Sequence, residues 1–265
     1  MHDCVPDTPG TPRRTARTQP RLRLCALGSG SSGNAYLVEG PQGPLLVDAG
    51  LSWRETLARS TKAGLSLTGL EWAILTHEHT DHVRGLDTLR RRGVRVAACS
   101  GTLRALGIEG TPLEPGTELA GVQVVPFAVP HDAAQPVGLR LEANGARVGI
   151  ATDLGQVTNS VLSALSTCQT VALEANHDVA MLLAGPYPWP LKLRILGPEG
   201  HLANEEAGRA LRALGNGLQQ VLLAHLSQDN NTPALALETV ARAVDGWKGR
   251  LYLTYPDRPS AVVGS

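Results

Sequence analysis

The residues best suited to chemistry stand in one short segment, where His77, His79, Asp81 and His82 follow an apolar run at 73–75. An apolar run of strand length requires burial, so it predicts a core strand that presents these side chains at its carboxyl end. His77 and His79 share one side of the extended chain, whereas Asp81 and His82 fall at the first turn of a helix expected over 83–91. Three of the chain's eight histidines lie here, which disfavours a metal-free polar loop. The spacing indicates two metals side by side.

Further histidines and carboxylates stand at the ends of other expected elements. His131 and His225 follow apolar runs, Asp153 follows a hairpin predicted across 144–145, and His177 and His201 stand near expected helix starts. Residues distributed in this way converge only at one edge of a sheet sandwich. They offer more ligands than one tetrahedral zinc uses, so two metals with a bridging carboxylate fit better. The absence of cysteine from the set argues against a structural zinc.

Alternating strands and helices predict a layered α/β fold, and 265 residues suffice for one large domain. The expected strands cover 21–27, 35–39, 43–50, 73–76, 95–99, a pair within 119–129, 137–141, 147–151, 170–173, 219–225 and 250–255. The expected helices cover 51–63, 83–91, 102–106, 161–166, 174–183, 200–214 and 233–244. Residues 1–20 lack a hydrophobic period and predict a disordered tail. We therefore expect a domain at 21–257 and a flexible tail at 258–265.

Composition limits the partners and the compartment. The formal net charge is zero, so no global cationic field favours indiscriminate nucleic-acid binding, and any contact with a polyanion must be local. The four cysteines form no CxxC pair, which is typical of buried residues in a reducing compartment. Neither a membrane span nor a signal peptide is evident. These features predict a cytoplasmic protein and leave homo-oligomerisation open.

A second set of polar residues surrounds the expected ligands. Asp48 ends an early strand. Its preferred role is to cap N–H groups of the loop, and the alternative role is to support the metal site. Asn34 closes the loop GSGSSGN, which resembles a phosphate nest but lacks the lysine of a P-loop. The remaining candidates for substrate or supporting contacts, for which helix capping is equally favoured, are Asn176, His177, Asn204, Asn230 and Asn231.

The order of the ligands resembles the metallo-β-lactamase fold, an αββα sandwich, over residues 21–255. This resemblance implies that His77, His79 and His131 hold a first metal. It also implies that Asp81, His82 and His225 hold a second metal and that Asp153 bridges the two. The resemblance also implies that Asp48 supports the site.

Four segments resemble the YycJ (WalJ) group of bacterial metal-dependent hydrolases, described as 5′-to-3′ DNA exonucleases. They are LGSGSSGN, LEANHD, GPYPWPLKLRILGPEGHLANEEA and LLAHLSQDNNTP. Ala203 departs from the serine usual in that group, which puts one hydroxyl contact in doubt. The gap between Asp153 and His225 is too short for the clamping domain of ribonuclease J-like enzymes. The tail motif is also similar to ribonuclease Z, which implies proton transfer by His201.

The resemblance implies two divalent ions, zinc or manganese, and hydrolysis of phosphodiesters, with DNA favoured over RNA and a role in DNA repair or processing. Asp81 is then expected to orient the attacking water, and His201 to protonate the leaving 3′ oxygen. Two alternatives stay open. The same ligands serve hydrolysis of a carbonyl ester, thioester or lactone, although no added helical substrate domain is evident. A non-catalytic regulatory binding module is disfavoured by the full ligand set.

Overall fold

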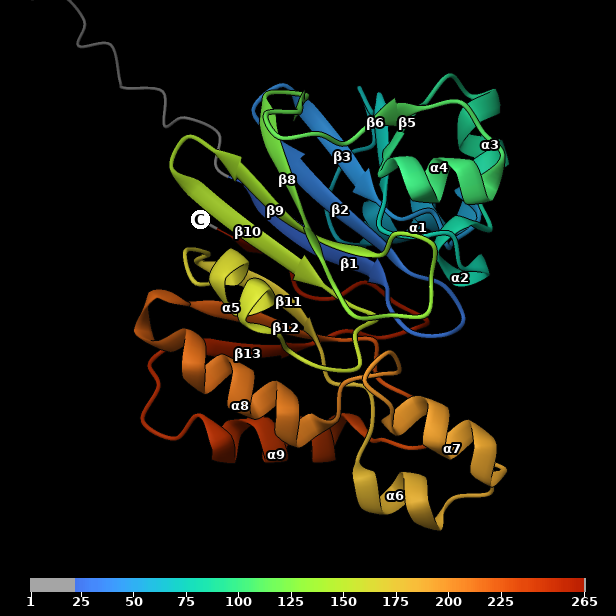
Figure 1. Cartoon of the computed structure of the whole chain (residues 1–265). Helices are drawn as coiled ribbons and strands as arrows, with labels where there is room; N and C mark the ends of the chain where they lie inside the picture. Colours follow the sequence, from blue (N-terminus) through green and yellow to red (C-terminus); the bar gives the residue numbers. More distant parts are fainter. Residues whose placement is uncertain (1–21, 265) are drawn as a thin grey trace, which may run out of the picture.

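A computed structural model describes residues 22–264, so the tail expected at 1–20 lies outside the described residues. Two seven-stranded sheets pack face to face, with helices on both outer faces (Figure 1). The first sheet has the order β14-β1-β2-β3-β4-β5-β6 and the second β13-β12-β11-β10-β9-β8-β7. This is the predicted αββα sandwich in a single domain.

The first sheet contains β1 (Arg23–Gly28), β2 (Ala35–Gly40), β3 (Gly43–Val47), β4 (Trp72–Leu75), β5 (Arg95–Ala98), β6 (Thr111–Pro112) and β14 (Val263–Gly264). The second contains β7 (Glu118–Leu119), β8 (Val122–Ala128), β9 (Val137–Ala143), β10 (Ala146–Ala151), β11 (Thr170–Glu174), β12 (Gln220–Ala224) and β13 (Arg250–Leu253). The helices are α1 (Trp53–Lys62), α2 (Thr80–Val83), α3 (Leu86–Arg91), α4 (Ser100–Leu106), α5 (Asn159–Leu165), α6 (Val179–Ala184), α7 (Trp189–Leu196), α8 (Asn204–Leu214) and α9 (Pro233–Ala243), with a 3₁₀ turn at Gly215–Gly217.

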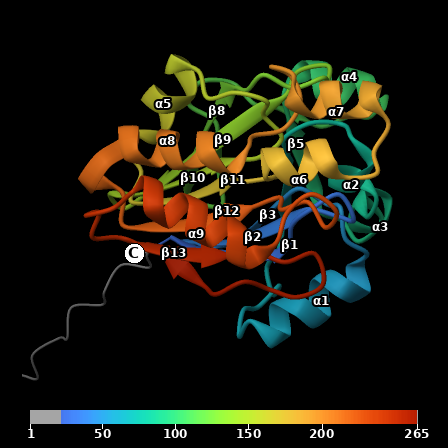
Figure 2. The same cartoon turned by 90° about the horizontal axis from the view of Figure 1, so that it is seen from below.

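Three apolar clusters hold these layers together. The inner cluster joins the facing sides of the two sheets, with Tyr36 and Leu139 among its members. The other two lie beneath the helices: α5, α8 and α9 cover the second sheet, and α1, α3 and α4 cover the first (Figure 2). Helices α6 and α7 project from this body (Figure 1). Among the described residues, no helix is long and apolar enough to cross a membrane.

Parallel pairing determines where the site forms. Strands β3 to β6 run parallel to one another, as do β10 to β13. Each run of parallel strands brings its carboxyl ends to one edge, where the connecting loops meet. The hairpin predicted across Asn144-Gly145 is confirmed, and both residues adopt the positive φ that such a turn requires.

Several expectations about secondary structure are wrong. The helices expected to begin at residues 174 and 200 begin at Val179 and Asn204. The helix expected over 83–91 is divided between α2 and α3, because the N–H of Gly85 turns to the carbonyl of Ala49 at 2.7 Å. Helix α7 was not expected at all. The flexible tail expected at 258–265 is ordered through residue 264: Val263 pairs with Leu24, and the hydroxyl of Ser260 accepts the N–H of Ala26 at 3.0 Å. An open edge of β1 thereby gains a partner.

Gly50 lets the loops that bear the site approach one another closely. A Cβ atom here would lie 1.7 Å from the carbonyl oxygen of Asp81, so even alanine does not fit. We expect Gly50→Ala to lower the free energy of unfolding by about 1–3 kcal/mol or more, because overpacking displaces both loops. Urea unfolding measures this change. Gly217→Ala is the matched control, since its Cβ would have no neighbour nearer than 4.0 Å; equal stability of the two variants would contradict the argument.

Candidate metal centre and active site

The structure brings the predicted ligands together at the edge where the loops meet. His77 and His79 follow β4, and Asp81 and His82 lie in the first turn of α2, whose N-cap is His79. The others follow β8, β10 and β12; they are His131, Asp153 and His225. Loops that follow the strands deliver five of these side chains, and the first turn of α2 delivers Asp81 and His82.

The ligand atoms form two adjacent groups. One consists of His77, His79 and His131, and the other of Asp81, His82, Asp153 and His225; within each group the ligand atoms all lie within 4.8 Å of one another. The ring centroids of His77 and His82 are 4.0 Å apart, so the groups adjoin. Apart from Asp153, which the resemblance implies as a bridging ligand and which lies in the second group, the grouping is the one that the resemblance implies.

Asp48 orients His82 from beneath the site. Its Oδ2 accepts a hydrogen bond from Nδ1 of His82 at 2.8 Å, and its Oδ1 accepts the N–H and hydroxyl of Thr76 at 2.9 and 3.0 Å. The fully buried Asp48 thus combines both roles considered for it, because it holds a loop N–H group and fixes an imidazole. A proton on Nδ1 leaves the Nε2 lone pair of His82 directed into the second group.

Glu174, which sequence analysis missed as a site residue, orients two imidazoles at once. Its Oε1 lies 3.1 Å from Nδ1 of His225 and 2.8 Å from Nδ1 of His201, while its Oε2 accepts the N–H of Leu154 at 2.8 Å. Asn176 assists by donating to the backbone carbonyl of His225 at 2.8 Å. Nε2 of His225 therefore faces the second group, and Nε2 of His201 is left available to a substrate.

The donor set fits metal ions. Nε2 of His77 and Nε2 of His225 are buried and have no hydrogen-bond partner among the described residues, and the buried Oδ2 of Asp153 lies 3.1 Å from Nε2 of His82, another potential ligand atom. Buried polar atoms without partners are costly, and here they are the nitrogen and oxygen donors that divalent metals take. The cluster is therefore suited to binding metal ions.

Electrostatics lead to the same conclusion. Burial raises the pKa of the Asp153 carboxyl, but the neighbouring His225 and His82 outweigh burial and hold that pKa well below its usual range. Burial opposes charge on His82, yet the Asp48 and Asp153 carboxylates raise its pKa to about 10. The ionised carboxylates thus stabilise positive charge in the site, and a bound divalent ion would provide that charge.

The backbone is strained at the ends of three strands. Asp48, Asp153 and His225 have φ values of 62°, 57° and 54°, in the left-handed region that non-glycine residues rarely adopt. Each such residue costs on the order of 1–3 kcal/mol. The strain turns the side chains into the site just where the strands end.

His201 does not begin a helix, contrary to the sequence prediction. It precedes Ala203, the N-cap of α8, and its side chain is 24% exposed. Burial lowers its pKa, but the Glu174 carboxylate outweighs burial, so the pKa is raised. The anion that stabilises a protonated His201 is therefore Glu174, 2.8 Å from its Nδ1.

The second set of polar candidates divides into two. Asn34 lies in the site, because its Nδ2 donates to Oδ2 of Asp81 at 3.0 Å and lies 3.0 Å from Nε2 of His82. Asn176 orients His225. The other members line no part of the pocket beside the ligands; they are His177, Asn204, Asn230 and Asn231.

These four residues connect loops beneath the site. His177 is buried with both ring nitrogens unpartnered, and burial lowers its pKa to about 4; its carbonyl accepts the N–H of Asn204 at 2.9 Å. The side-chain amides of Asn204 and Asn231 bind each other at 3.0 and 2.9 Å. The carbonyl of Asn230 accepts the N–H of Asp178 at 2.9 Å.

A pocket of about 180 Å³ opens beside the ligand groups. His131 and His201 line it together with Tyr187, Leu191 and Arg194 from the segment of α6 and α7. A phosphate held here would lie next to both the first ligand group and the imidazole of His201.

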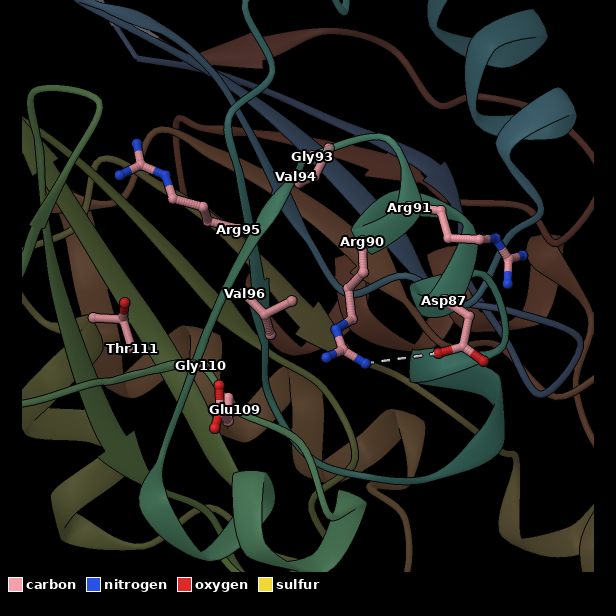
Figure 3. A pocket seen from close by; sticks show the side chains of 10 residues that line it. All are labelled: Asp87, Arg90, Arg91, Gly93, Val94, Arg95, Val96, Glu109, Gly110 and Thr111. Carbon is pink, nitrogen blue, oxygen red and sulfur yellow. Dashed lines mark ion pairs between the residues drawn. The ribbon is translucent and has the colours of Figure 1, made fainter.

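A larger groove, of about 770 Å³, lies at the other end of the first sheet (Figure 3). Arg95, which lines it, pairs in register with Trp72 at the amino end of β4, whereas the histidines follow the carboxyl end. Its basic side chains are partly neutralised: Arg90 lies 3.9 Å from Asp87, and Arg95 lies 2.7 Å from Glu71. No histidine lines this groove, so the chemistry belongs to the smaller pocket.

Comparison with known proteins confirms the fold. The family model described as "Beta-lactamase superfamily domain" matches residues 44–226, and the chain belongs to this superfamily as a hydrolase of the metallo-β-lactamase fold. Within it, exodeoxyribonuclease YycJ of Bacillus anthracis is 34% identical over 236 residues, which cover 84% of this chain and 89% of that protein. Exodeoxyribonuclease WalJ of Streptococcus pneumoniae is 34% identical over 256 residues, 89% of this chain and 95% of that protein. The chain is a member of this YycJ and WalJ family.

Solved structures share the fold at low identity. The metallo-β-lactamase fold protein YhfI from Bacillus subtilis has a TM-score of 0.72 at 15% identity, covering 93% of this chain and all of its own. The short form of human tRNase Z has a TM-score of 0.58 at 16% identity, covering 78% of this chain and 93% of its own. At these identities the likeness concerns the fold alone.

Proposed function

We propose that this protein is a dinuclear metal-dependent phosphodiesterase that degrades DNA from the 5′ end, in DNA repair or processing. The observation that carries the proposal is the position of His201: it adjoins both ligand groups and is held by Glu174, so a proton donor faces the pocket. The relatives named exodeoxyribonuclease support DNA as the substrate.

The chain's own residues have distinct roles in this proposal. Bound zinc or manganese ions supply Lewis acidity that activates water and neutralises the phosphate. His77, His79 and His131 would hold one ion, and the second group, which includes Asp153, would hold the other. Asp81, fixed by Asn34, orients the attacking water toward phosphorus. His201 donates the proton from Nε2 to the leaving 3′ oxygen, while Glu174 retains Nδ1.

Hydrolysis of a carbonyl ester, thioester or lactone is the second candidate, because the same ligands polarise a carbonyl. A thiolate leaving group needs no proton, so a proton donor at His201 disfavours a thioester. An ester or a lactone releases an alkoxide as a phosphodiester does, and against these substrates stand the relatives named exodeoxyribonuclease. A non-catalytic binding module would have no need of strained site residues at three strand ends.

A nuclease assay on DNA and RNA tests the activity. The substrates are single- and double-stranded, labelled at either end, with zinc and manganese varied. We expect shortening of DNA from the 5′ end that chelation abolishes. Turnover of a thioester or lactone without cleavage of any nucleic acid would contradict the proposal and favour the second candidate.

Metal stoichiometry provides a separate prediction. We expect two ions per chain at saturation, because seven ligand side chains exceed the four that one tetrahedral ion uses. Elemental analysis after metal loading and desalting measures the number. His225→Ala should retain about one ion by loss of the second site, with circular dichroism as the control for folding. A wild-type value of one would exclude a dinuclear site.

A further inference from the structure

Helices α6 and α7 and the loop between them form an arm that walls the active-site pocket on one side. Tyr187, Leu191 and Arg194 of this arm line the same pocket as His131 and His201. A substrate that reaches His201 therefore lies against the arm.

The arm is held firmly enough to position a substrate contact. The ammonium of the buried Lys192 donates to the carbonyls of Leu183 and Gly185 at 2.6 and 2.7 Å, which ties α7 to the end of α6. The hydroxyl of Tyr187 donates to Oδ2 of Asp229 at 2.6 Å, which joins the arm to the loop after β12.

Arg194 is the one lysine or arginine among the residues that line this pocket. Its Nε and Nη2 bind Oδ2 of Asp132 at 2.8 and 2.6 Å, and its Nη1 has no protein partner among the described residues. The side chain is 61% exposed, so this edge of the guanidinium is accessible. Asp132 thereby fixes the orientation of Arg194 without using all of its donors.

The charge of Arg194 has a consequence at the mouth of the site. Oδ1 of Asp132 lies 3.5 Å from Nε2 of His131, next to the first ligand group. An unneutralised carboxylate there would repel a phosphodiester, and Arg194 offsets it. A fixed guanidinium with donors to spare is also the group best matched to phosphate oxygens.

We propose that Arg194 is a specificity-determining residue that contacts the phosphate carried by the leaving nucleotide, one residue away from the scissile phosphate. The inference rests on the proposed function, in which His201 protonates the leaving oxygen and the leaving nucleotide therefore occupies the pocket. A volume of about 180 Å³ is below the roughly 300–1,000 Å³ of ordinary ligand pockets, so the pocket has no room for a base pair. Substrates with this second phosphate are accordingly favoured.

Two thymidine dinucleotides that differ only in a 5′-phosphate test the contact. The measured quantity is the ratio of kcat/KM for the phosphorylated to the unphosphorylated dinucleotide, with the metal-loaded full chain. We expect wild-type protein to favour the phosphorylated form, and Arg194→Ala to lower this ratio by about ten- to a hundredfold, the effect of one charged hydrogen bond. Arg194→Lys keeps the charge but not the fork and should restore part of the ratio.

A third substrate, the 5′-methyl phosphate of the dinucleotide, carries one charge like an internal phosphate. If the protein prefers the 5′-methyl phosphate over the unphosphorylated dinucleotide and this preference depends on Arg194, the ligand of Arg194 is an internal phosphate. If only the preference for the free 5′-phosphate depends on Arg194, the ligand is a terminal phosphate. Either result supports the contact. Arg209→Ala is the matched control, because Arg209 is an exposed arginine paired with Glu206 on α8, and its ratio should equal that of wild type.

The alternative is that Arg194 merely anchors the arm to Asp132. Tyr187→Phe removes the other anchoring hydrogen bond and reports on that role. If Arg194→Ala leaves the ratio unchanged, or if Tyr187→Phe lowers it equally, the inference is overturned. If the wild-type protein cleaves neither dinucleotide nor any DNA, the proposed function itself has failed, which is a different outcome.

Discussion

Asp81→Asn is expected to lower phosphodiester hydrolysis by about 10²–10⁴-fold while the fold persists. Oδ2 of Asp81 lies 3.5 Å from Nε2 of His82 and 3.7 Å from Nε2 of His225, so the carboxylate faces the second ligand group. Its side chain is 22% exposed, which leaves it accessible to water at the pocket. The asparagine side chain has the same shape as aspartate, but it lacks the negative charge and one hydrogen-bond acceptor. Its NH₂ group can also face the side-chain amide donor of Asn34.

Single-turnover kinetics on a labelled oligonucleotide measure this loss, and circular dichroism and thermal unfolding test whether the fold persists. Asp87→Asn is the matched control, because Asp87 is exposed on α3 and lies outside both ligand groups. It should retain wild-type turnover. Near-normal turnover by Asp81→Asn would show that this carboxylate neither holds a metal nor orients the attacking water.

The ligand positions were predictable because each follows a recognisable apolar run. Parallel pairing brings the carboxyl ends of β3 to β6 to one edge of the first sheet and those of β10 to β13 to one edge of the second. The packing of the two sheets then places the histidines after β4 and β12 close together. Glu174 carries the same signal after the apolar run 171–173, but it falls at the start of the helix expected over 174–183 and was not recognised as a strand end. It ends the buried strand β11, and its function arises only when folding brings it to residues 27 and 51 positions away in sequence.

Helix α7 shows the limit of proline as a breaker signal. Pro188 and Pro190 read as interruptions, yet Pro188 is the N-cap of α7 and Pro190 lies in its first turn. A proline there loses no hydrogen bond, because the first N–H groups of a helix have no partner within it. For this reason the sequence did not predict α7, which together with α6 forms the arm beside the pocket.

The end of the chain was misjudged for a different reason. Residues 258–264 contain no run of strand length, and proline and glycine flank the short apolar segment. Val263 is nonetheless buried, because β1 offers an unpaired edge that only a distant segment covers. Pairing of this kind depends on the assembled sheet and leaves little local signal.

His201→Ala is expected to reduce cleavage of DNA by about 10²–10⁴-fold, because the leaving 3′ oxygen then departs without a proton. Nδ1 of His201 is retained by Glu174, so Nε2 is the nitrogen that faces the substrate. The loss should be less than about tenfold on a p-nitrophenyl phosphodiester, whose leaving group is a stable anion. Activity on the two substrates therefore separates proton donation from binding.

The same variant has to be tested for metal content, because His201 also lies within 4.8 Å of Asp153, Glu174 and His225 in a third group of potential ligand atoms. Unchanged stoichiometry together with a leaving-group-dependent loss identifies the general acid. Loss of an ion would make His201 a ligand, and equal losses on both substrates would make it a binding residue. His177→Ala is the matched control: His177 is buried, lies outside all three groups and should show no such dependence on the leaving group. If His177→Ala shows the leaving-group-dependent loss instead of His201→Ala, His177 is the general acid.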